Sequence, residues 1–120
     1  AFERQVLESL HAEKNTTSFT TIDGRVTTVP DLPLNSRFGV TDIKDEIKLS
    51  FDKQLKAQQA AAVTAGQPFN LVVSPRTQRI SRPLQTKIRE TGGRIFQYDP
   101  EANRFSDVVT RGNRVVRDDE

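Results

Sequence analysis

Three charged side chains, two acids and a lysine, have the spacing of a small metal site in this sequence. Ten residues separate Asp31 from Asp42, and one residue separates Asp42 from Lys44. If residues 39–47 form a strand, Asp42 and Lys44 lie on one face and Ile43 turns to the opposite face, toward a core. Two carboxylates beside an ammonium group could hold a hard cation and stabilise negative charge next to it. Metal-assisted phosphodiester hydrolysis requires groups of this kind.

The same residues also have plain structural interpretations. Asp31 follows Pro30, and this pair commonly forms a turn. Lys44 could form a surface ion pair with Asp42 that contributes at most about 1 kcal/mol. The secondary structure predicted around the three residues therefore has to distinguish a metal site from an ordinary surface.

Two elements are predicted before the motif. Apolar residues at helical spacing predict a helix over residues 2–14, with Glu3 inside its apolar arc and Glu8 pointing away. Because an acid is costly to bury without a partner, Glu3 either extends to solvent at the helix end or faces a cation. Residues 16–29 are rich in β-branched side chains around an Asp-Gly pair, which predicts a β-hairpin. Its second arm ends just before Asp31, which places this acid at a strand terminus.

The residues after the motif predict a β-α-β unit. Ser50 is a candidate N-cap for a helix over residues 51–65, and Gly66 is its candidate C-cap. Residues 68–74 form a short, nearly continuous apolar run, which predicts a strand buried on both faces. This strand should lie parallel to the strand that carries Asp42, with the helix as a right-handed crossover.

A further helix and a last strand are predicted beyond this unit. Ser81 is the expected N-cap, Pro83 lies in the first turn, and the helix should end at Gly92. Residues 94–98 then predict the last strand of the core. Residues 99–120 are polar and form a C-terminal extension of the core, in which residues 111–120 are expected to be a loose tail with at most one short strand.

Composition restricts the class of protein. A chain of 120 residues is long enough for a single domain, here 1–120, with a real core. It has neither an apolar run long enough to span a membrane nor a visible signal peptide, so no membrane anchor is expected in this domain. The absence of cysteine excludes disulfides and thiolate metal sites, and a single histidine, His11, argues against a histidine-rich zinc site. Because the chain begins at Ala1 rather than Met, we expect it to be part of a longer protein.

Positive charge is concentrated in one segment, although the formal net charge is only +2. Within residues 76–94 the only acid is Glu90, and the cations are Arg76, Arg79, Arg82, Lys87, Arg89 and Arg94. A basic segment without a wide apolar face suits phosphate groups better than a membrane. The alternative interpretation is a solvated basic helix.

Taken together, these motifs resemble the PD-(D/E)XK nucleases, which have the restriction-endonuclease-like fold. Pro30-Asp31 matches the first half of the family pattern, and Asp42-Ile43-Lys44 matches the second half with Asp in place of the commoner Glu. Further segments look most like the nuclease toxin domains at the C-termini of bacterial polymorphic toxins: Phe2-Glu3 with Val6 and Leu10, Ser50 to Leu55, Gly66 to Val73, and Ser81 to Leu84.

The resemblance implies an α/β fold and a set of site residues. The expected fold is a restriction-endonuclease-like core, about residues 2–98, with a mixed central sheet of about four to five strands flanked by helices. The resemblance implies that Asp31, Asp42 and Lys44 are catalytic, and that Asp31, Asp42 and Glu3, or Glu8 in place of Glu3, hold Mg²⁺ or Mn²⁺. The substrate-binding residues implied or predicted from charge are Gln54, Gln58, Arg76, Arg79 and Arg82.

The resemblance also implies a substrate, a partner and a place of action. DNA is favoured over tRNA, and the alternatives are a tRNA- or RNA-cleaving toxin of the same fold or a non-catalytic nucleic-acid-binding module. A toxin of this type would need an acidic cognate immunity protein in the producing cell. It would be secreted or delivered as part of a larger bacterial toxin and would act in the target-cell cytoplasm.

Overall fold

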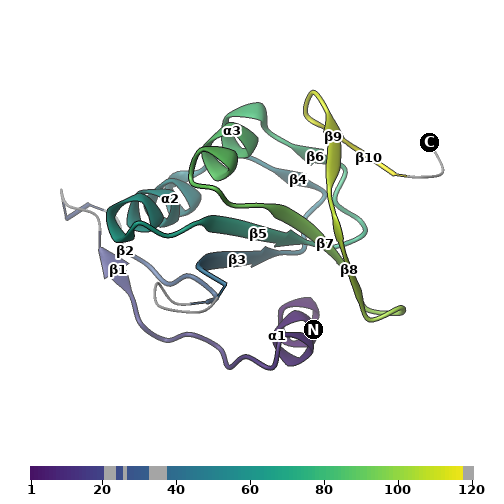
Figure 1. The fold of residues 1–120 in the computed structure, drawn as a ribbon, viewed down its shortest axis with the longest axis horizontal. Helices are drawn as coiled ribbons and strands as arrows, with labels where there is room; N and C mark the ends of the chain where they lie inside the picture. Colours follow the sequence, from purple (N-terminus) through teal and green to yellow (C-terminus); the bar gives the residue numbers. More distant parts are fainter. Residues whose placement is uncertain (21–23, 26, 33–37, 118–120) are drawn as a thin grey trace.

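The computed structural model describes residues 1–20, 24–25, 27–32 and 38–117 (Figure 1). The helices in this part of the chain are α1 (Phe2–Ser9), α2 (Lys53–Ala65) and α3 (Arg82–Glu90). The strands are β1 (Phe19–Thr20), β2 (Thr27–Thr28), β3 (Val40–Lys44), β4 (Lys48–Leu49), β5 (Phe69–Val73), β6 (Arg79–Ile80), β7 (Ile95–Asp99), β8 (Arg104–Asp107), β9 (Val109–Arg111) and β10 (Arg114–Val116). No described helix has the length and apolar character needed to cross a membrane.

A four-stranded mixed sheet forms the centre of the molecule, with the strand order β3-β5-β7-β8. The first three strands are parallel, and β8 is antiparallel to β7. Helix α2 connects β3 to the adjacent parallel strand β5, which confirms the predicted β-α-β unit. The expected α/β fold with a mixed sheet of about four strands flanked by helices is therefore present.

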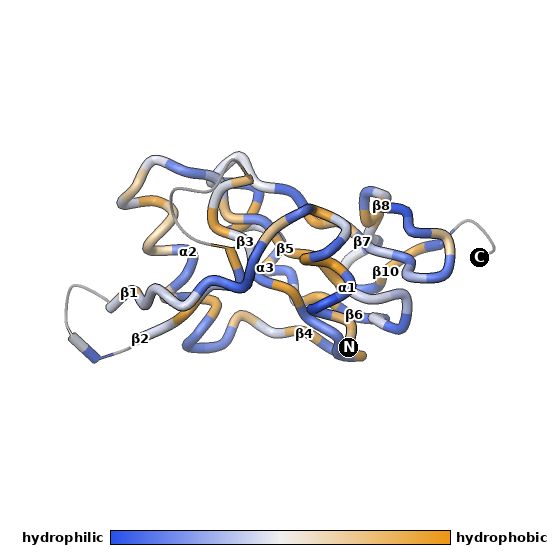
Figure 2. The backbone as a smooth tube through the Cα atoms, turned by 90° about the horizontal axis from the view of Figure 1, so that it is seen from below, coloured by the Kyte–Doolittle hydropathy of each residue, from blue (hydrophilic) through white to orange (hydrophobic). Residues whose placement is uncertain are grey.

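Two hydrophobic cores lie on opposite faces of this sheet. On one face, Leu71 and Val73 of β5 pack in the same core as side chains of α2 and α3. On the other face, Val72 of β5 and Ile43 of β3 pack with α1. The alternation predicted for β3 and the burial of β5 on both faces are thus both confirmed. Figure 2 shows the hydrophobic stretches of β3 and β5 in the middle of the molecule.

A second four-stranded sheet, with the order β4-β6-β10-β9, packs against the first of these cores. Leu49, Ile80 and Val115 point inward from three of its strands and are at most 5% exposed. The short strands β1 and β2 form a separate antiparallel pair, which confirms the predicted hairpin arms. Residues 21–23 of the predicted turn lie outside the described residues.

The first helix is shorter than predicted, because it ends at Ser9 rather than near residue 14. His11 has a φ of 54°, in the left-handed region that stops a right-handed helix. The backbone N–H of Ala12 donates to the Leu7 carbonyl at 2.9 Å, and that of His11 donates to the Glu8 carbonyl at 3.1 Å. These two bonds close the helix in a Schellman motif in which histidine takes the place usually occupied by glycine.

Two further boundaries differ from the prediction around the acid-x-lysine strand. The strand ends at Lys44 instead of continuing to residue 47, and β4 begins separately in the second sheet. Helix α2 is capped by Asp52, whose carboxylate accepts a hydrogen bond from the Leu55 N–H at 2.9 Å, and not by Ser50. Ser81 does cap α3, as predicted, by accepting from the Leu84 N–H at 3.3 Å.

Residues 111–116 do not form the loose tail that was expected, and the polar residues before them are also part of strands. Together they form β8, which adds an edge strand to the central sheet, and the β9–β10 hairpin, which completes the second sheet. Short strands with mostly polar, outward side chains gave no continuous apolar run to detect. Their pairing depends on long-range partners such as β6 and β7, which local sequence does not reveal.

Candidate active site

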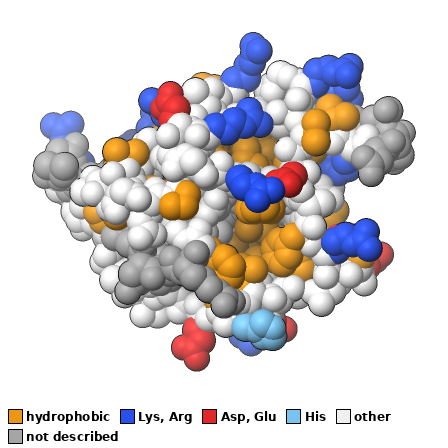
Figure 3. Space-filling model, in the orientation of Figure 1, with side chains coloured by type: hydrophobic (Ala, Val, Ile, Leu, Met, Phe, Trp, Pro, Cys, Tyr) orange, Lys and Arg blue, Asp and Glu red, His pale blue; other side chains and the backbone are white. Residues whose placement is uncertain are grey.

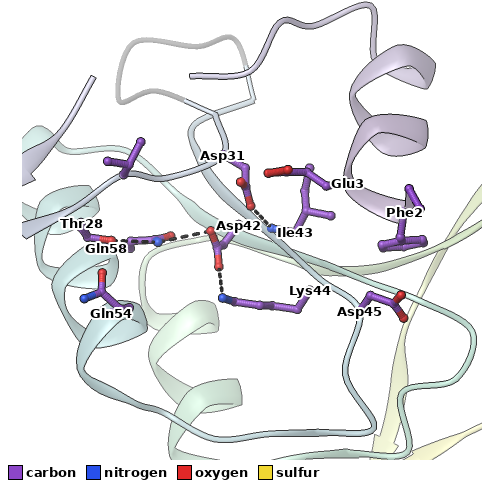
Figure 4. Close-up of a pocket in the computed structure, with 12 residues that line it drawn as sticks. Phe2, Glu3, Thr28, Asp31, Asp42, Ile43, Lys44, Asp45, Gln54 and Gln58 are labelled. Atoms are coloured by element: carbon purple, nitrogen blue, oxygen red, sulfur yellow. Dashed lines mark hydrogen bonds and ion pairs between the residues drawn. The ribbon is translucent and has the colours of Figure 1, made fainter. Parts of the chain in front are cut away.

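Most of the predicted site residues line one open hollow of about 510 Å³ at the end of β3 (Figure 4). It lies between the start of α1, the segment after β2 and the first turns of α2. The side chains that it brings together are Glu3, Asp31, Asp42, Lys44, Gln54 and Gln58. The first and the last of these residues, Glu3 and Gln58, are more than 50 positions apart in the sequence. The site is therefore assembled by the fold and is not a single local motif.

Strand β3 sets the positions of Asp42 and Lys44. Both residues project from the face opposite Ile43, which is buried against α1. Asp42 is only 3% exposed, and its Oδ2 lies 3.1 Å from the Lys44 Nζ. The acid-x-lysine pair is therefore a largely buried ion pair that opens into the hollow.

Asp31 is held beside this pair by contacts across the chain. The backbone N–H of Ile43 donates to Asp31 Oδ2 at 2.6 Å, and the next residue, Leu32, forms a backbone bridge with Thr41. On the other side, Asn15 Nδ2 donates to the Pro30 carbonyl at 2.8 Å. Asp31 thus follows β2 in an irregular segment rather than ending a strand, and it still reaches the end of β3.

The three carboxyl groups influence one another strongly. Burial, the adjacent Glu3 and the nearby Asp42 raise the pKa of Asp31 to about 9. The hydrogen bond with Asp31 lowers the pKa of Glu3, and Lys14 adds to this effect. Asp31 consequently carries a proton at neutral pH when no cation is bound, while Glu3 remains ionised.

Lys44 is a cation in this arrangement. Burial acts to lower the pKa of its ammonium group, but the neighbouring Asp42 carboxylate outweighs burial and the net pKa is raised. An ammonium group that is held in the charged form can stabilise negative charge, but it is poorly suited to accept a proton. Lys44 is therefore placed beside Asp42 as an electrostatic group.

Two glutamines of α2 reach the site in different ways. Gln58 is 3% exposed, and its Nε2 donates to Asp42 Oδ1 at 3.2 Å and to Thr28 Oγ1 at 3.1 Å. Its amide is thus directed at Asp42, so it orients the acid. Gln54 is exposed on the wall of the hollow, where a substrate contact stays a prediction.

Two residues of the site had no recognisable signal in the sequence. Asn15 fixes the segment that carries Asp31, and Thr28 is the second partner of Gln58. Each acts through a contact between segments that are distant in sequence, 15 residues apart for Asn15 and 30 for Thr28. A buried asparagine in an irregular segment is the only hint that a sequence could offer, and it points to no particular partner.

A comparison with models of known families shows the family to which this chain belongs. Residues 1–84 match the model described as restriction endonuclease fold toxin 7. The chain belongs to this toxin family. Neither the curated proteins nor the solved structures that were compared with the chain gave a match. Membership confirms the resemblance found in the sequence and indicates a nuclease toxin.

The part of this toxin domain that matches the family contains the whole hollow. Its lining residues run from Ala1 to Gln58, well inside residues 1–84. The match ends at Leu84, within α3, so β7 to β10 lie outside it. The matched region thus contains the acids and the lysine, whereas the second sheet is completed by strands beyond it.

Several predicted positions lie away from the hollow. Glu8 is exposed and lines a different depression, so Glu3 is the acid that α1 contributes here. Arg76 and Arg79 line another hollow, and Arg82 occupies the first turn of α3. Arg76 nevertheless forms a 2.6 Å ion pair with Asp45, which belongs to the rim of the site.

Two carboxylates of this toxin domain, those of Asp31 and Asp42, are suitable ligands for a hard cation. Within the described ranges, no group of three or more acidic, histidine or cysteine side chains is arranged to hold a metal as it stands. Mg²⁺ commonly uses one or two carboxylates and completes its shell with water and substrate phosphate. Asp31 and Asp42 meet that requirement, and Glu3 as a third ligand stays a prediction.

The buried polar atoms of the hollow support this fit. Gln58 Oε1 is buried and lacks a donor, and the buried Asp42 Oδ2 has only the Lys44 Nζ, at 3.1 Å, as a partner among the described residues. In addition, burial and then the neighbouring Glu3 and Asp42 raise the pKa of Asp31, so an ionised Asp31 lacks a compensating charge in the hollow. A divalent cation or its bound water would satisfy both features.

A second hollow provides a contrast within the described structure. It has a volume of about 420 Å³ and is lined mainly by apolar side chains, including Leu10, Phe38, Phe96 and Phe105. Figure 3 shows apolar side chains gathered in the centre of the face seen in Figure 1. No acid is among the residues that line this second hollow, in contrast to the first.

Proposed function

We propose that this domain is a divalent-metal-dependent nuclease that hydrolyses phosphodiester bonds. The observation that carries the proposal is the convergence of Asp31, Asp42 and Lys44 in one open hollow at the end of β3. Family membership supports a nuclease toxin, and the chemistry of the hollow supports the dependence on a metal.

Asp31 and Asp42 would hold Mg²⁺ or Mn²⁺. When bound, such an ion neutralises charge on the scissile phosphate and lowers the pKa of a water molecule. Asp31 must lose its proton to act as a ligand, so metal binding should release a proton near neutral pH. The Ile43 N–H keeps the Asp31 carboxyl group aimed at the site in both states.

The remaining residues position and stabilise. The Lys44 ammonium, fixed beside Asp42, would stabilise the negative charge that develops on the phosphate during attack. Gln58 would keep Asp42 oriented through its 3.2 Å hydrogen bond. At position 42, Asp replaces the commoner Glu, so the carboxylate has a shorter reach. Because Asp42 is buried at the end of β3, a metal ion would have to bind close to this strand.

DNA is the substrate that we favour over tRNA. Recognition of single-stranded RNA commonly relies on aromatic side chains that stack on splayed bases. Tyr98, the one tyrosine of the chain, is 4% exposed, and its hydroxyl donates to Asn103 at 2.7 Å. It is therefore unavailable for stacking, and Phe2, the aromatic residue that lines the active-site hollow, is also buried, which favours a substrate recognised through its backbone.

An antibacterial role follows from the same proposal. A nuclease toxin would damage the cell that makes it unless an immunity protein blocked it, and an acidic inhibitor would complement the exposed arginines and lysines. We propose that the domain is delivered as part of a larger bacterial toxin and acts in the cytoplasm of the target cell. Expression of the wild type in a bacterial cytoplasm should be toxic, and Lys44→Ala at a matched protein level should relieve the toxicity.

A panel of substrates tests the proposal directly. Plasmid DNA, tRNA and duplex RNA are incubated with the purified domain and Mg²⁺, each with and without EDTA. We expect cleavage of the plasmid that EDTA abolishes and Mg²⁺ restores. Cleavage of tRNA alone would keep the nuclease and correct the substrate, whereas binding without cleavage of any substrate would identify a non-catalytic module.

A further inference from the structure

The second sheet carries a row of four cations, one on each strand. Lys48 of β4 pairs with Arg79 of β6, Arg79 pairs with Arg114 of β10, and Arg114 pairs with Arg111 of β9. Directly paired residues on neighbouring strands project from the same face of a sheet. The four side chains, which we call the cationic row, therefore share one face.

That face points to solvent. Each member of the cationic row is exposed, whereas the residue next to it in β4, β6 and β10 is buried in the core. Neighbouring strands lie about 4.8 Å apart, so the row extends over roughly 14 Å. Like charges directly opposite one another destabilise a sheet, and a bound polyanion would remove that repulsion.

Three of the four members of the cationic row keep an unpaired charge within the described part of the chain. Among the residues that the structure describes, no carboxylate lies at ion-pair distance from Lys48, Arg79 or Arg111. Arg79 Nη1 donates to Asn113 Oδ1 at 3.2 Å, a neutral partner that leaves its charge in place. Arg79 and Arg114 also line a hollow of about 410 Å³, together with Arg76 and Arg117.

The cationic row is connected to the candidate active site. Asp45 lies on the rim of the site and forms the 2.6 Å ion pair with Arg76, which lines the hollow beside the row. Only residues 45–47 separate β3, which carries Asp42 and Lys44, from the first strand of the second sheet. Figure 1 shows β4, β6, β9 and β10 grouped beside the central sheet.

We propose that the cationic row binds the sugar-phosphate backbone of the nucleic acid whose phosphodiester bond enters the active site. This inference rests on the proposed nuclease function and adds a second contact region to it. Arginine suits this role because its guanidinium group can donate two hydrogen bonds to one phosphate. Arg111 and Arg114 lie beyond the region that matches the family model, so the C-terminal hairpin contributes half of the row.

A nucleic acid fits the row better than an acidic protein does. The four positions are in register across neighbouring strands about 4.8 Å apart, and a nucleic-acid strand presents negative charges at regular intervals. At about 3.4 Å of rise per nucleotide, roughly 14 Å corresponds to about four nucleotides. An acidic protein surface has no comparable repeat. Binding of an acidic protein is the competing outcome of the test.

The test compares three variants of the full domain in a Lys44→Ala background, which prevents cleavage during binding. The first removes charge from the row by Lys48→Gln, Arg111→Gln and Arg114→Gln. The second keeps charge at the same positions by Lys48→Arg, Arg111→Lys and Arg114→Lys. The third removes three exposed cations elsewhere by Lys87→Gln, Arg89→Gln and Arg104→Gln, which gives the same net charge as the first.

The readout is the affinity for a short DNA duplex at several salt concentrations, with Mg²⁺ present and with circular dichroism as a check of folding. Each lost phosphate contact reduces the slope of log K against log salt by roughly 0.9 on duplex DNA. We expect the first variant to lose about 2 to 3 units of slope and to bind at least tenfold more weakly at low salt. The second and third variants should keep the slope of the background protein.

Three outcomes would overturn the inference. Equal slopes for the first and third variants would show that only net charge matters, and an unchanged slope in the first would show that the row faces away from DNA. Binding to poly-glutamate, which represents an acidic protein, is measured in the same way. If the first variant loses binding to poly-glutamate but not to DNA, the row binds an acidic protein instead. Plasmid cleavage by the wild type is measured separately, so a nuclease without a functional row is distinguished from a protein that is no nuclease.

Discussion

The active-site hollow and the cationic row use charge in opposite ways. In the hollow, three carboxyl groups and Lys44 are partly or fully buried, and their neighbours shift the pKa values of Glu3, Asp31 and Lys44. In the row, four cations stand in solvent at strand spacing. Buried charges interact strongly and are weakly screened by salt, whereas exposed charges interact weakly and are screened within about 10 Å.

This difference indicates a division of labour within one small domain. Removing one member of the hollow should disable the other members, because each depends on its neighbours for orientation or protonation. Removing one member of the row should subtract only its own contribution to affinity. The predictions below test whether the two regions behave in these two ways.

The largest effect is expected for catalysis. Asp42→Asn and Lys44→Ala should each reduce the rate of plasmid cleavage by about 100- to 1000-fold or more, as for the loss of other electrostatic groups at a reacting centre. The double variant should be no slower than the worse single variant, because residues that act as a unit are not additive. Single-turnover rates measure this, and multiplicative losses would place the two residues outside a common unit.

The next effect concerns the pH dependence of stability in EDTA. The folded-state pKa of Asp31, about 9, lies above its unfolded value of 3.8, so between these values the folded state binds more protons. The free energy of unfolding should therefore fall as pH rises through this window, by no more than about 1.4 kcal/mol per pH unit from this group. Asp31→Asn, which resembles the protonated acid, should flatten the profile.

Urea unfolding at several pH values provides the measurement for Asp31. Glu8→Gln is a suitable control, because Glu8 is an exposed acid on α1 that lies away from the hollow. Parallel profiles for the wild type and Asp31→Asn would contradict the charge coupling in the hollow. The same Asp31→Asn domain should bind Mg²⁺ more weakly in a titration.

An intermediate effect is expected for the glutamine that orients Asp42. Gln58→Ala removes a buried hydrogen bond to the acid and should lower the free energy of unfolding by about 1–3 kcal/mol and slow cleavage. Gln54→Ala, on the exposed wall of the hollow, should change stability by no more than about 0.5 kcal/mol. Denaturant titration of both variants separates the two roles, and equal losses would be inconsistent with the buried position of Gln58.

The smallest effect is expected for the stability of the second sheet. Neutralising Lys48, Arg111 and Arg114 together should leave the free energy of unfolding unchanged or raise it by up to about 1 kcal/mol, since paired like charges repel. The effect should fade in high salt. A clear loss of stability would show that these side chains stabilise the sheet instead of being available to bind a ligand.

The sequence was sufficient for those parts of the fold that follow from local patterns. The apolar run of β5, the alternation in β3 and the Ser81 cap of α3 all depend on neighbouring residues, and all were predicted. The placement of Asp42 and Lys44 on one strand face also followed from their spacing, whereas the position of Asp31 beside them was implied by the family resemblance. The end of α1 was not predictable, because a left-handed histidine at position 11 is uncommon.

The parts that the sequence could not reveal depend on distant partners. The strands β8 to β10 are short and polar, and they are defined by pairing with β6 and β7. The cationic row arises only when Lys48, Arg79 and two later arginines are placed in register. The basic segment was visible in the sequence, but the second half of the row was not.

The most direct test of the central claim is the Mg²⁺ dependence of cleavage by the wild type and by Asp42→Asn. Supercoiled plasmid is incubated with each purified domain after treatment with EDTA, and then with increasing Mg²⁺. We predict that the wild type is inactive in EDTA and recovers with Mg²⁺, whereas Asp42→Asn, folded by circular dichroism, stays inactive at every Mg²⁺ concentration. Full activity of the wild type in EDTA, or equal activity of the two proteins, would contradict a metal-dependent nuclease centred on Asp42.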